Sequence, residues 1–170
     1  NERQIKRIGF PLNKLLIKRT LYAVGGTYLA AKTALSSCLA ACNITGGYHH
    51  AHKDFGSGFC ILNDLVVTAR LLLDNNQADK VLIFDLDVHQ GDGTAALAQE
   101  MKDIFTCSVH CGENFPARKS HSDLDIEVPK GADDSEYLSI VDEALHLAIQ
   151  MSQPDLIIYD AGADVHYKDE

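Results

Sequence analysis

The sequence predicts an α/β sandwich built on a mostly parallel sheet. Three short apolar runs rich in strand-forming residues, at 80–85, 104–109 and 155–159, have the length and composition of strands buried in a parallel sheet. Segments with helical spacing or helix-forming composition lie between them, and this alternation is typical of α/β units. We expect a single domain over residues 1–170, because the chain contains no repeat, low-complexity tract or linker.

The first part of the chain is predicted to be mostly helical. Residues 12–42 combine many alanines, which are strong helix formers, with regularly placed leucines. These leucines are Leu15, Leu16, Leu29, Leu35 and Leu39. Gly25-Gly26 interrupts the run, and we expect it to weaken the helix unless close packing or a helix boundary explains it. The apolar piece at 41–44 is predicted to be a short strand that leads into Gly46-Gly47.

Three further helices follow from spacing and capping. One lies around residues 62–73, and another covers residues 95–101. Asp133 and Glu136 form a capping box that predicts the start of the third helix. The apolar face of this third helix consists of Tyr137, Val141, Leu145 and Ala148.

The composition argues against several classes of protein. A net charge of −9 opposes direct binding to a nucleic-acid backbone, and it would suit a cationic substrate such as a lysine-rich tail. The five cysteines include no CxxC pair, so neither a zinc ribbon nor a disulfide framework is expected. No apolar run approaches the length of a membrane span, and no cleavable signal pattern opens the chain. We therefore expect no membrane association and cytoplasmic residence, or nuclear residence in a eukaryote.

The two ends of the chain suggest a piece of a longer protein. The sequence begins at Asn1 without an initiator Met, and it stops six residues after the candidate site residue Asp164. We therefore expect a fragment. The oligomeric state is not predicted by any feature of the sequence.

A candidate metal site lies after the predicted strands. Asp87 and His89 follow the strand at 80–85, and two residues that are two positions apart in extended chain can face the same way. Asp164, after the strand at 155–159, would complete a set of three ligands with a position left open for water or substrate. Oxygen and nitrogen ligands with an open position suit catalytic zinc, while iron, cobalt and manganese stay open as alternatives.

A histidine-rich loop supplies candidate acid–base groups. His49-His50 lies in the glycine-flanked segment GGYHHAH, where core packing alone does not explain so many imidazoles. They could form a second metal site or a general acid–base pair. Asp85 and Asp92 flank the metal motif and are available to orient the two imidazoles.

The residues around these motifs resemble the histone deacetylase superfamily. The matching strings are GGYHHAHKDFGSGFCILND (46–64), FDLDVHQGDGT (84–94), HCGENFP (110–116) and DAGAD (160–164). The first string, with RIGFP near the start and RKSHSDLDIEVP at 118–129, looks most like the class IV branch and its bacterial relatives. The resemblance covers essentially the whole chain, and it implies the three-layer arginase/deacetylase-like sandwich, incomplete at both ends.

The resemblance also implies roles for individual residues. Asp87, His89 and Asp164 are similar to the family's zinc ligands. His49 and His50 resemble the tandem histidines that serve the attacking water and the departing amine, with Asp85 behind the first and Asp92 behind the second. The residues that resemble the acyl-lysine tunnel are Gly58, Phe59 and Phe115. Those that resemble the family's potassium shell are Asp85, Asp87, His89, Ser108 and Val109.

These roles imply a zinc-dependent amidohydrolase that removes acetyl or longer acyl groups from lysine side chains of proteins such as histones. The family also uses a tyrosine, far beyond the third zinc ligand, to donate a hydrogen bond to the developing oxyanion. Tyr167 is too close to Asp164 for that role, so we expect that residue to lie outside the chain.

Two other functions stay open from the sequence. The same chemistry could act on small acetylated amines or polyamines, or the fragment could be a catalytically silent domain that binds acyl-lysine or a partner protein. The retained ligands and the histidine pair argue against the silent domain. An arginase-like pair of manganese ions is disfavoured, because a single Asp-x-His lacks further bridging carboxylates.

The remaining histidines have an ordinary interpretation. His52, His121, His146 and His166 are predicted to be solvated or capping side chains.

Overall fold

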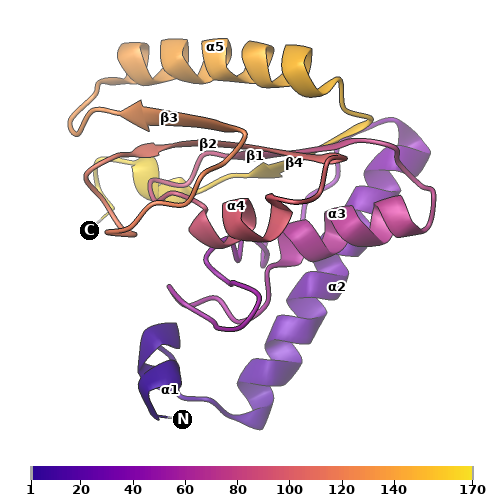
Figure 1. Cartoon of the computed structure of the whole chain (residues 1–170), viewed down its shortest axis with the longest axis vertical. Helices are drawn as coiled ribbons and strands as arrows, with labels where there is room; N and C mark the ends of the chain where they lie inside the picture. Colours follow the sequence, from indigo (N-terminus) through magenta and orange to yellow (C-terminus); the bar gives the residue numbers. More distant parts are fainter. Residues whose placement is uncertain (1, 170) are drawn as a thin grey trace.

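The computed structural model describes residues 2–169, which form a four-stranded parallel sheet with helices on both faces (Figure 1). The strands are β1 (Val81–Asp85), β2 (Ile104–Cys111), β3 (Leu124–Val128) and β4 (Leu156–Asp160), in the order β3-β2-β1-β4. The helices are α1 (Glu2–Ile8), α2 (Lys14–Ser37), α3 (Asp64–Asp74), α4 (Asp92–Ala98), α5 (Asp134–Ser152) and the short 3₁₀ helix η1 (Ala163–Val165). The predicted three-layer α/β sandwich is confirmed.

Strand β1 lies inside the sheet, between β2 and β4, and every one of its residues is buried. Its side chains alternate between the two faces, as they must in a strand. Val81 and Ile83 pack with α3 and α4, whereas Leu82 and Phe84 pack with α5. Burying each such side chain stabilises the fold by roughly 1.5–3 kcal/mol. One continuous apolar run thus supplies the core of both layers.

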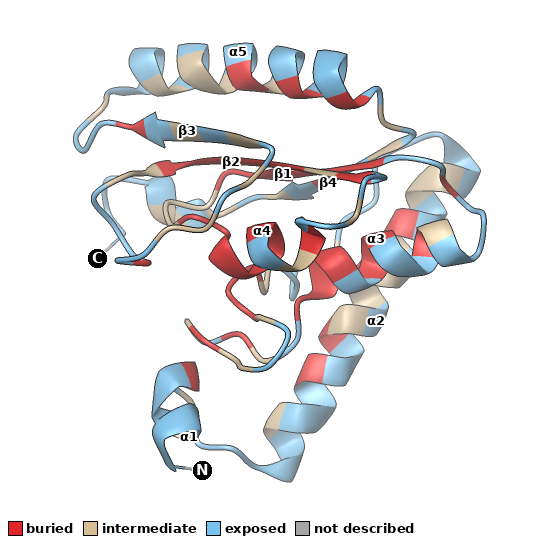
Figure 2. Cartoon of the chain, viewed as in Figure 1, coloured by how far each residue is buried: buried red, intermediate tan, exposed pale blue. Residues whose placement is uncertain are grey.

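Helix α5 covers one face of the sheet, and α2, α3 and α4 lie on the other (Figure 1). The residues of α5 that face the sheet are small, with Ala144 and Ala148 fully buried, so the helix can approach the strands closely. Its outer surface is exposed along its whole length (Figure 2). The carboxylate of Asp133 accepts a hydrogen bond from the Glu136 backbone N–H at 2.9 Å, which confirms the predicted start of this helix.

In the first part of the chain one expectation is met and one was wrong. Helix α2 runs unbroken through Gly25-Gly26, and the close packing that we expected as one explanation is found at Gly26, where a Cβ would lie 3.0 Å from the Asn43 amide. The segment 41–44 is not a strand. Asn43 instead donates to Ala23 O and Thr27 Oγ1 of α2, and the Ile44 side chain is 93% exposed.

Other boundaries also differ from the prediction. Helix α4 covers Asp92–Ala98, so it begins and ends three residues earlier than the predicted helix at 95–101. Strands β1, β2 and β4 lie where the apolar runs predicted them, although β2 extends to Cys111. Within residues 2–169, no helix is long and apolar enough to cross a bilayer.

Candidate active site at the carboxyl edge of the sheet

The polar motifs meet at the carboxyl ends of β1, β2 and β4. The strands are parallel, and Asp85 at the end of β1 pairs in register with Ser108 of β2 and Asp160 of β4. In open α/β sheets this edge is where ligands bind. The loops that leave these strands therefore carry their side chains to one place.

Asp87, His89 and Asp164 converge to form a candidate metal site. The Nδ1 atom of His89 lies 2.9 Å from Asp87 Oδ1 and 3.1 Å from Asp164 Oδ2. One ligand atom from each residue lies within 4.8 Å of the others. The three side chains are 20–31% exposed, so the cluster is open on one side. Two carboxylates, one imidazole and an open side are a donor set that suits catalytic zinc.

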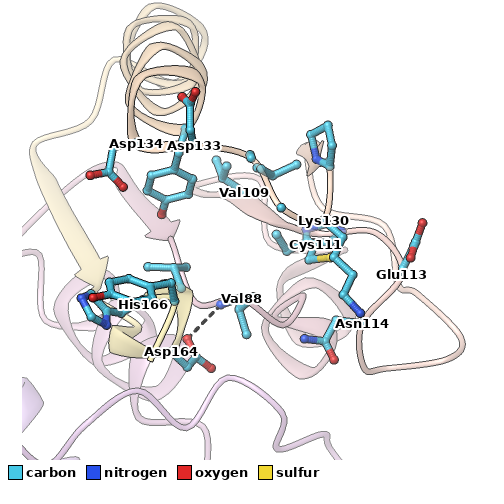
Figure 3. Close-up of a pocket in the computed structure, with 18 of the residues that line it drawn as sticks. Val88, Val109, Cys111, Glu113, Asn114, Lys130, Asp133, Asp134, Asp164 and His166 are labelled. Atoms are coloured by element: carbon cyan, nitrogen blue, oxygen red, sulfur yellow. Dashed lines mark hydrogen bonds between the residues drawn. The ribbon is translucent and has the colours of Figure 1, made fainter. Parts of the chain in front are cut away.

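Local backbone contacts hold this cluster. The Asp87 carboxylate accepts from the His89 backbone N–H at 2.8 Å, and the Asp164 carboxylate accepts from the Val88 backbone N–H at 3.0 Å (Figure 3). Gly162 allows the close approach of the two loops, because a Cβ there would collide with the Asp87 backbone. The loops after β1 and β4 are thus tied together across the site.

The charges within the cluster favour a bound cation. Hydrogen bonds to Asp164 and Asp87 raise the pKa of His89 to about 9. Burial of Asp87 opposes its ionisation, but its contacts with His89 and His49 outweigh burial and lower its pKa to about 2. The two carboxylates therefore hold a proton on the imidazole nitrogen that lies between them. A divalent cation that displaces this proton would meet the same three ligand atoms.

The histidine pair lies buried beside this cluster, and each ring is backed by a carboxylate. His49 Nδ1 is 2.7 Å from Asp85 Oδ2, and His50 Nδ1 is 2.7 Å from Asp92 Oδ1. The two ring centroids are 4.0 Å apart. His49 Nε2 lies 3.7 Å from Asp87 Oδ1, so this face of the pair points at the metal cluster. Carboxylates at Nδ1 fix the orientation of both rings.

The two histidines differ in charge. Burial opposes the charged form of His49, but Asp85, Asp87 and Asp160 outweigh burial and raise its pKa to about 10. Burial lowers the pKa of His50. The hydrogen bond to Asp92 offsets only part of this effect, and the neighbouring His49 lowers the pKa further. In neighbouring groups whose pKa values are pushed apart, the one with the lower pKa is suited to act as the base. Here that residue is His50.

The loop before the histidine pair is anchored by Asp64, the buried first residue of α3. Its carboxylate accepts from the backbone N–H groups of Gly47, at 3.2 Å, and Tyr48, at 2.8 Å. It also accepts from the Thr27 hydroxyl of α2 at 2.5 Å. Gly46 must lack a side chain, because a Cβ would lie 2.6 Å from Asp64 Oδ2. The glycines before His49 thus allow a close contact between this loop and α3.

The residues predicted for a substrate tunnel lie in two places near the pair. The Phe115 ring is 4.9 Å from His50 and 6.2 Å from His89, edge-on to both. Gly58 packs against the His50 ring and has a positive φ of 49°. Phe59 is 60% exposed and packs on Phe10, at 5.0 Å between ring centroids. Phe115 and Gly58 therefore lie against the His50 ring, whereas Phe59 packs against Phe10, in the segment that follows α1.

The residues predicted for a potassium site lie on adjacent strand ends. Asp85 and Ser108 are register partners, and Val109 follows Ser108 on β2. All three are almost fully buried. Asp85 Oδ1 accepts from the Asp87 backbone N–H at 3.0 Å, and Ser108 Oγ lies 3.0 Å from His110 Nδ1. The adjacent strand ends thus bring together three of the five residues predicted for this site, and the potassium ion itself stays a prediction.

Two further residues at the site were missed by the sequence analysis. Asp160 ends β4, and its Oδ2 atom, 3.8 Å from His49 Nδ1, is buried with no hydrogen-bond partner within residues 2–169. Burial and the neighbouring Asp85 raise the pKa of Asp160 well above its ordinary value. The signal in the sequence was the position of Asp160 directly after the predicted strand at 155–159 and shortly before Asp164.

His52 was predicted to be solvated or capping, and that prediction was wrong. Its Nε2 atom lies 3.1 Å from Asp92 Oδ2, and its side chain is only 16% exposed. His121, His146 and His166 are exposed, as expected. The signal for His52 in the sequence was weak, namely its place two residues after His50 in the same histidine-rich loop.

A cavity of about 720 Å³ adjoins the metal cluster (Figure 3). Asp164 and Val88 lie at its edge, and the start of α5, with Asp133 and Asp134, forms another wall. Neither His49 nor His50 lines it. The cavity therefore reaches the cluster through Asp164 and is separate from the histidine pair.

The chain is similar to a family of known proteins over almost its whole length. Residues 2–170 match the model of the histone deacetylase domain. An uncharacterized protein of Picosynechococcus is 50% identical over 164 residues, which cover 96% of this chain and 54% of that protein. Histone deacetylase 2 of Arabidopsis thaliana is 34% identical over 169 residues, covering 95% of this chain and 43% of that protein. The chain thus spans about half the length of these relatives.

The fold also resembles that of a solved structure. Acetylpolyamine aminohydrolase from Burkholderia pseudomallei aligns with a TM-score of 0.68 and 25% identity, covering 86% of this chain and 46% of that one. The similarity extends over all but a seventh of this chain.

Proposed function

Because this chain belongs to the histone deacetylase domain family, we propose that its protein is a zinc-dependent amidohydrolase acting on acylated lysine side chains. The substrate would be a protein such as a histone, and the group removed an acetyl or longer acyl chain. The observation that carries the proposal is the meeting of two clusters at one sheet edge. Asp87, His89 and Asp164 converge there beside a histidine pair in which each ring is backed by a carboxylate.

Asp87, His89 and Asp164 would hold the zinc. Their donor atoms already lie close together, and the partial exposure of all three leaves room for a fourth ligand. When bound, zinc supplies a Lewis acid that polarises the amide carbonyl and lowers the pKa of a bound water. The chain's own residues would do the rest of the chemistry.

His50 would accept the proton of the attacking water and pass it to the departing amine nitrogen. Its lowered pKa keeps the imidazole neutral and able to accept that proton near neutral pH. His49, with a pKa of about 10, would remain an imidazolium that stabilises negative charge on the reacting carbonyl. The water oxygen bonds to the carbonyl carbon and the C–N bond of the amide breaks, which leaves the acyl group as a carboxylate and the lysine side chain as an ammonium. Asp85 and Asp92 would orient the two rings.

Gly58, Phe59 and Phe115 would enclose the apolar stem of the acyl-lysine. The exposed aromatic rings of Phe59 and Phe115, and the contact of Phe115 with His50, support this role. An apolar channel around the stem would exclude water from the reaction. A potassium ion would be held by Asp85, Asp87, His89, Ser108 and Val109. The pairing of Asp85 with Ser108 at the ends of adjacent strands supports this. A class IV type of deacetylase remains our prediction from the sequence motifs.

A second candidate substrate is a small acetylated amine. The similarity to an acetylpolyamine aminohydrolase supports it, since that protein is named for such a substrate. The net charge of −9 suits a polyamine as well as a lysine-rich tail. Neither substrate involves a nucleic acid or a membrane.

The proposal is tested by comparing substrates side by side with the zinc-loaded protein. The assay measures kcat/KM for an acetyl-lysine peptide, a longer-acylated lysine peptide and an N-acetylated polyamine. We expect hydrolysis of a lysine peptide with the highest kcat/KM. A clear preference for the polyamine would favour the second candidate. Binding of the peptides without any hydrolysis would indicate a silent acyl-lysine-binding domain and contradict both enzymatic proposals.

A further inference from the structure

Asp92 divides its two carboxylate oxygens between two imidazoles. Its Oδ1 lies 2.7 Å from His50 Nδ1, and its Oδ2 lies 3.1 Å from His52 Nε2. Burial opposes the ionisation of Asp92, but these histidines outweigh burial and lower its pKa. An ionised carboxylate can only accept hydrogen bonds, so both imidazole nitrogens donate to it. His50, Asp92 and His52 therefore form one hydrogen-bonded chain.

His52 is itself held in place. Its ring stacks on Phe55, with 4.3 Å between centroids and 23° between planes. Its backbone N–H donates to Phe55 O at 2.9 Å. The Arg7 guanidinium of α1 lies 4.4 Å from the centroid of the same Phe55 ring. These contacts restrict the orientation of the His52 ring independently of its bond to Asp92.

We propose that His52 is a positioning residue that locks Asp92 behind His50, an inference that rests on the proposed function. Oδ1 also accepts from the Gly93 backbone N–H at 3.0 Å, so without His52 the carboxylate would be held at Oδ1 alone. The last side-chain torsion of an Asp is broad and weakly restrained, and a carboxylate held at one oxygen can still turn about that oxygen. A donor at Oδ2 restrains the second oxygen and keeps Oδ1 in line with His50 Nδ1. The His50 ring is then held with Nε2 free for the reaction, as a second partner holds the carboxylate behind other catalytic imidazoles.

The donor and the stacked ring of His52 can be separated by two substitutions. His52→Phe keeps an aromatic ring against Phe55 but has no donor for Asp92. His52→Gln loses the ring but places an amide N–H at a similar distance from the backbone. His146→Phe is a matched control, because His146 is exposed on α5 and its contacts are with Asp142 of the same helix.

The experiment measures kcat and KM for an acetyl-lysine peptide with each zinc-loaded variant. We expect His52→Phe to lower kcat on the order of 10-fold with KM little changed. His52→Gln should recover most of that loss, and His146→Phe should match the unmodified protein. A normal kcat in His52→Phe, or a loss of kcat in His52→Gln equal to that in His52→Phe, would overturn the positioning role.

A second readout needs no hydrolysis and so separates this inference from the proposed function. The Nδ1–H proton of His50, in its bond to Asp92, gives a downfield NMR resonance in the substrate-free protein. We expect this resonance to shift or broaden in His52→Phe and to return in His52→Gln. An unchanged resonance in His52→Phe contradicts the inference even if the protein proves inactive on every acyl substrate. If His52→Phe does not fold, the test uses His52→Gln. A folded His52→Gln protein whose His50 resonance and kcat both differ from those of the unmodified protein would contradict the inference.

Discussion

Replacing Asp64 by Asn should loosen the loop that carries the histidine pair. The Asn oxygen can still accept from the Tyr48 N–H, but the amide NH₂ would face the Gly47 N–H and the Thr27 hydroxyl that now donate to Oδ2. The hydroxyl can turn to Ala23 O, which lies 3.3 Å away, whereas the Gly47 N–H loses its acceptor. A hydrogen bond to a charged group contributes about 1.5–3 kcal/mol, so we expect a loss of about that size.

This loss is large against the roughly 5–15 kcal/mol by which domains are stable. Chemical denaturation followed by circular dichroism measures it as a change in the free energy of unfolding. Asp74→Asn is the matched control: Asp74 is the last residue of the same helix, and its exposed ion pair with Arg70 contributes little. If Asp64→Asn were as stable as Asp74→Asn within about 0.5 kcal/mol, the loop would not depend on this carboxylate.

Three other predictions concern the histidine pair and its loop. His50→Ala should lower kcat about 10²–10⁴-fold while zinc content stays near one per chain, and loss of the metal would show that His50 is a ligand instead. In the unmodified protein, burial and His49 lower the pKa of His50, so the neutral base persists below its ordinary value. The profile of kcat/KM against pH should therefore fall on the acid side at a pH below about 6.5, and a fall above that value would contradict this role for His50. Gly46→Ala should cost about 1–3 kcal/mol in the free energy of unfolding, because its Cβ would lie 2.6 Å from Asp64 Oδ2; an unchanged denaturation midpoint would refute that packing argument.

Much of the fold could be predicted from hydrophobic pattern alone. The apolar runs of β1 and β2 indicate strands that are buried on both faces, as inner strands of a parallel sheet are. The run of β4 was also found by its composition, although β4 lies at the edge of the sheet and only its central residue, Ile158, is buried. Strand β3 was missed because it lies at the edge of the sheet and alternates charged and apolar residues in only five positions. The partner of Gly26, Asn43, could not be identified from the sequence for a related reason. Their contact joins α2 to a loop, and neither residue indicates its partner by its neighbours in the chain.

The candidate site could likewise be predicted only in part. Asp87-x-His89 and His49-His50 stand out because unusual polar residues follow a strand or a glycine pair within a few positions. The pairings of His49 with Asp85 and His50 with Asp92 span 36 and 42 residues, and only the family resemblance suggested them before the structure. His52 had no such precedent, and a histidine two residues from a reactive pair looks like any solvated histidine. Its bond to Asp92 depends on how the loop returns to the start of α4.

The central claim is that Asp87, His89 and Asp164 form the zinc site of this protein. It is tested most directly by measuring bound zinc per chain in the unmodified protein, in Asp87→Ala and in the exposed control Asp74→Ala. We expect one zinc in the unmodified protein and the control, and none in Asp87→Ala. Full zinc occupancy in Asp87→Ala would contradict the ligand assignment and the mechanism built on it.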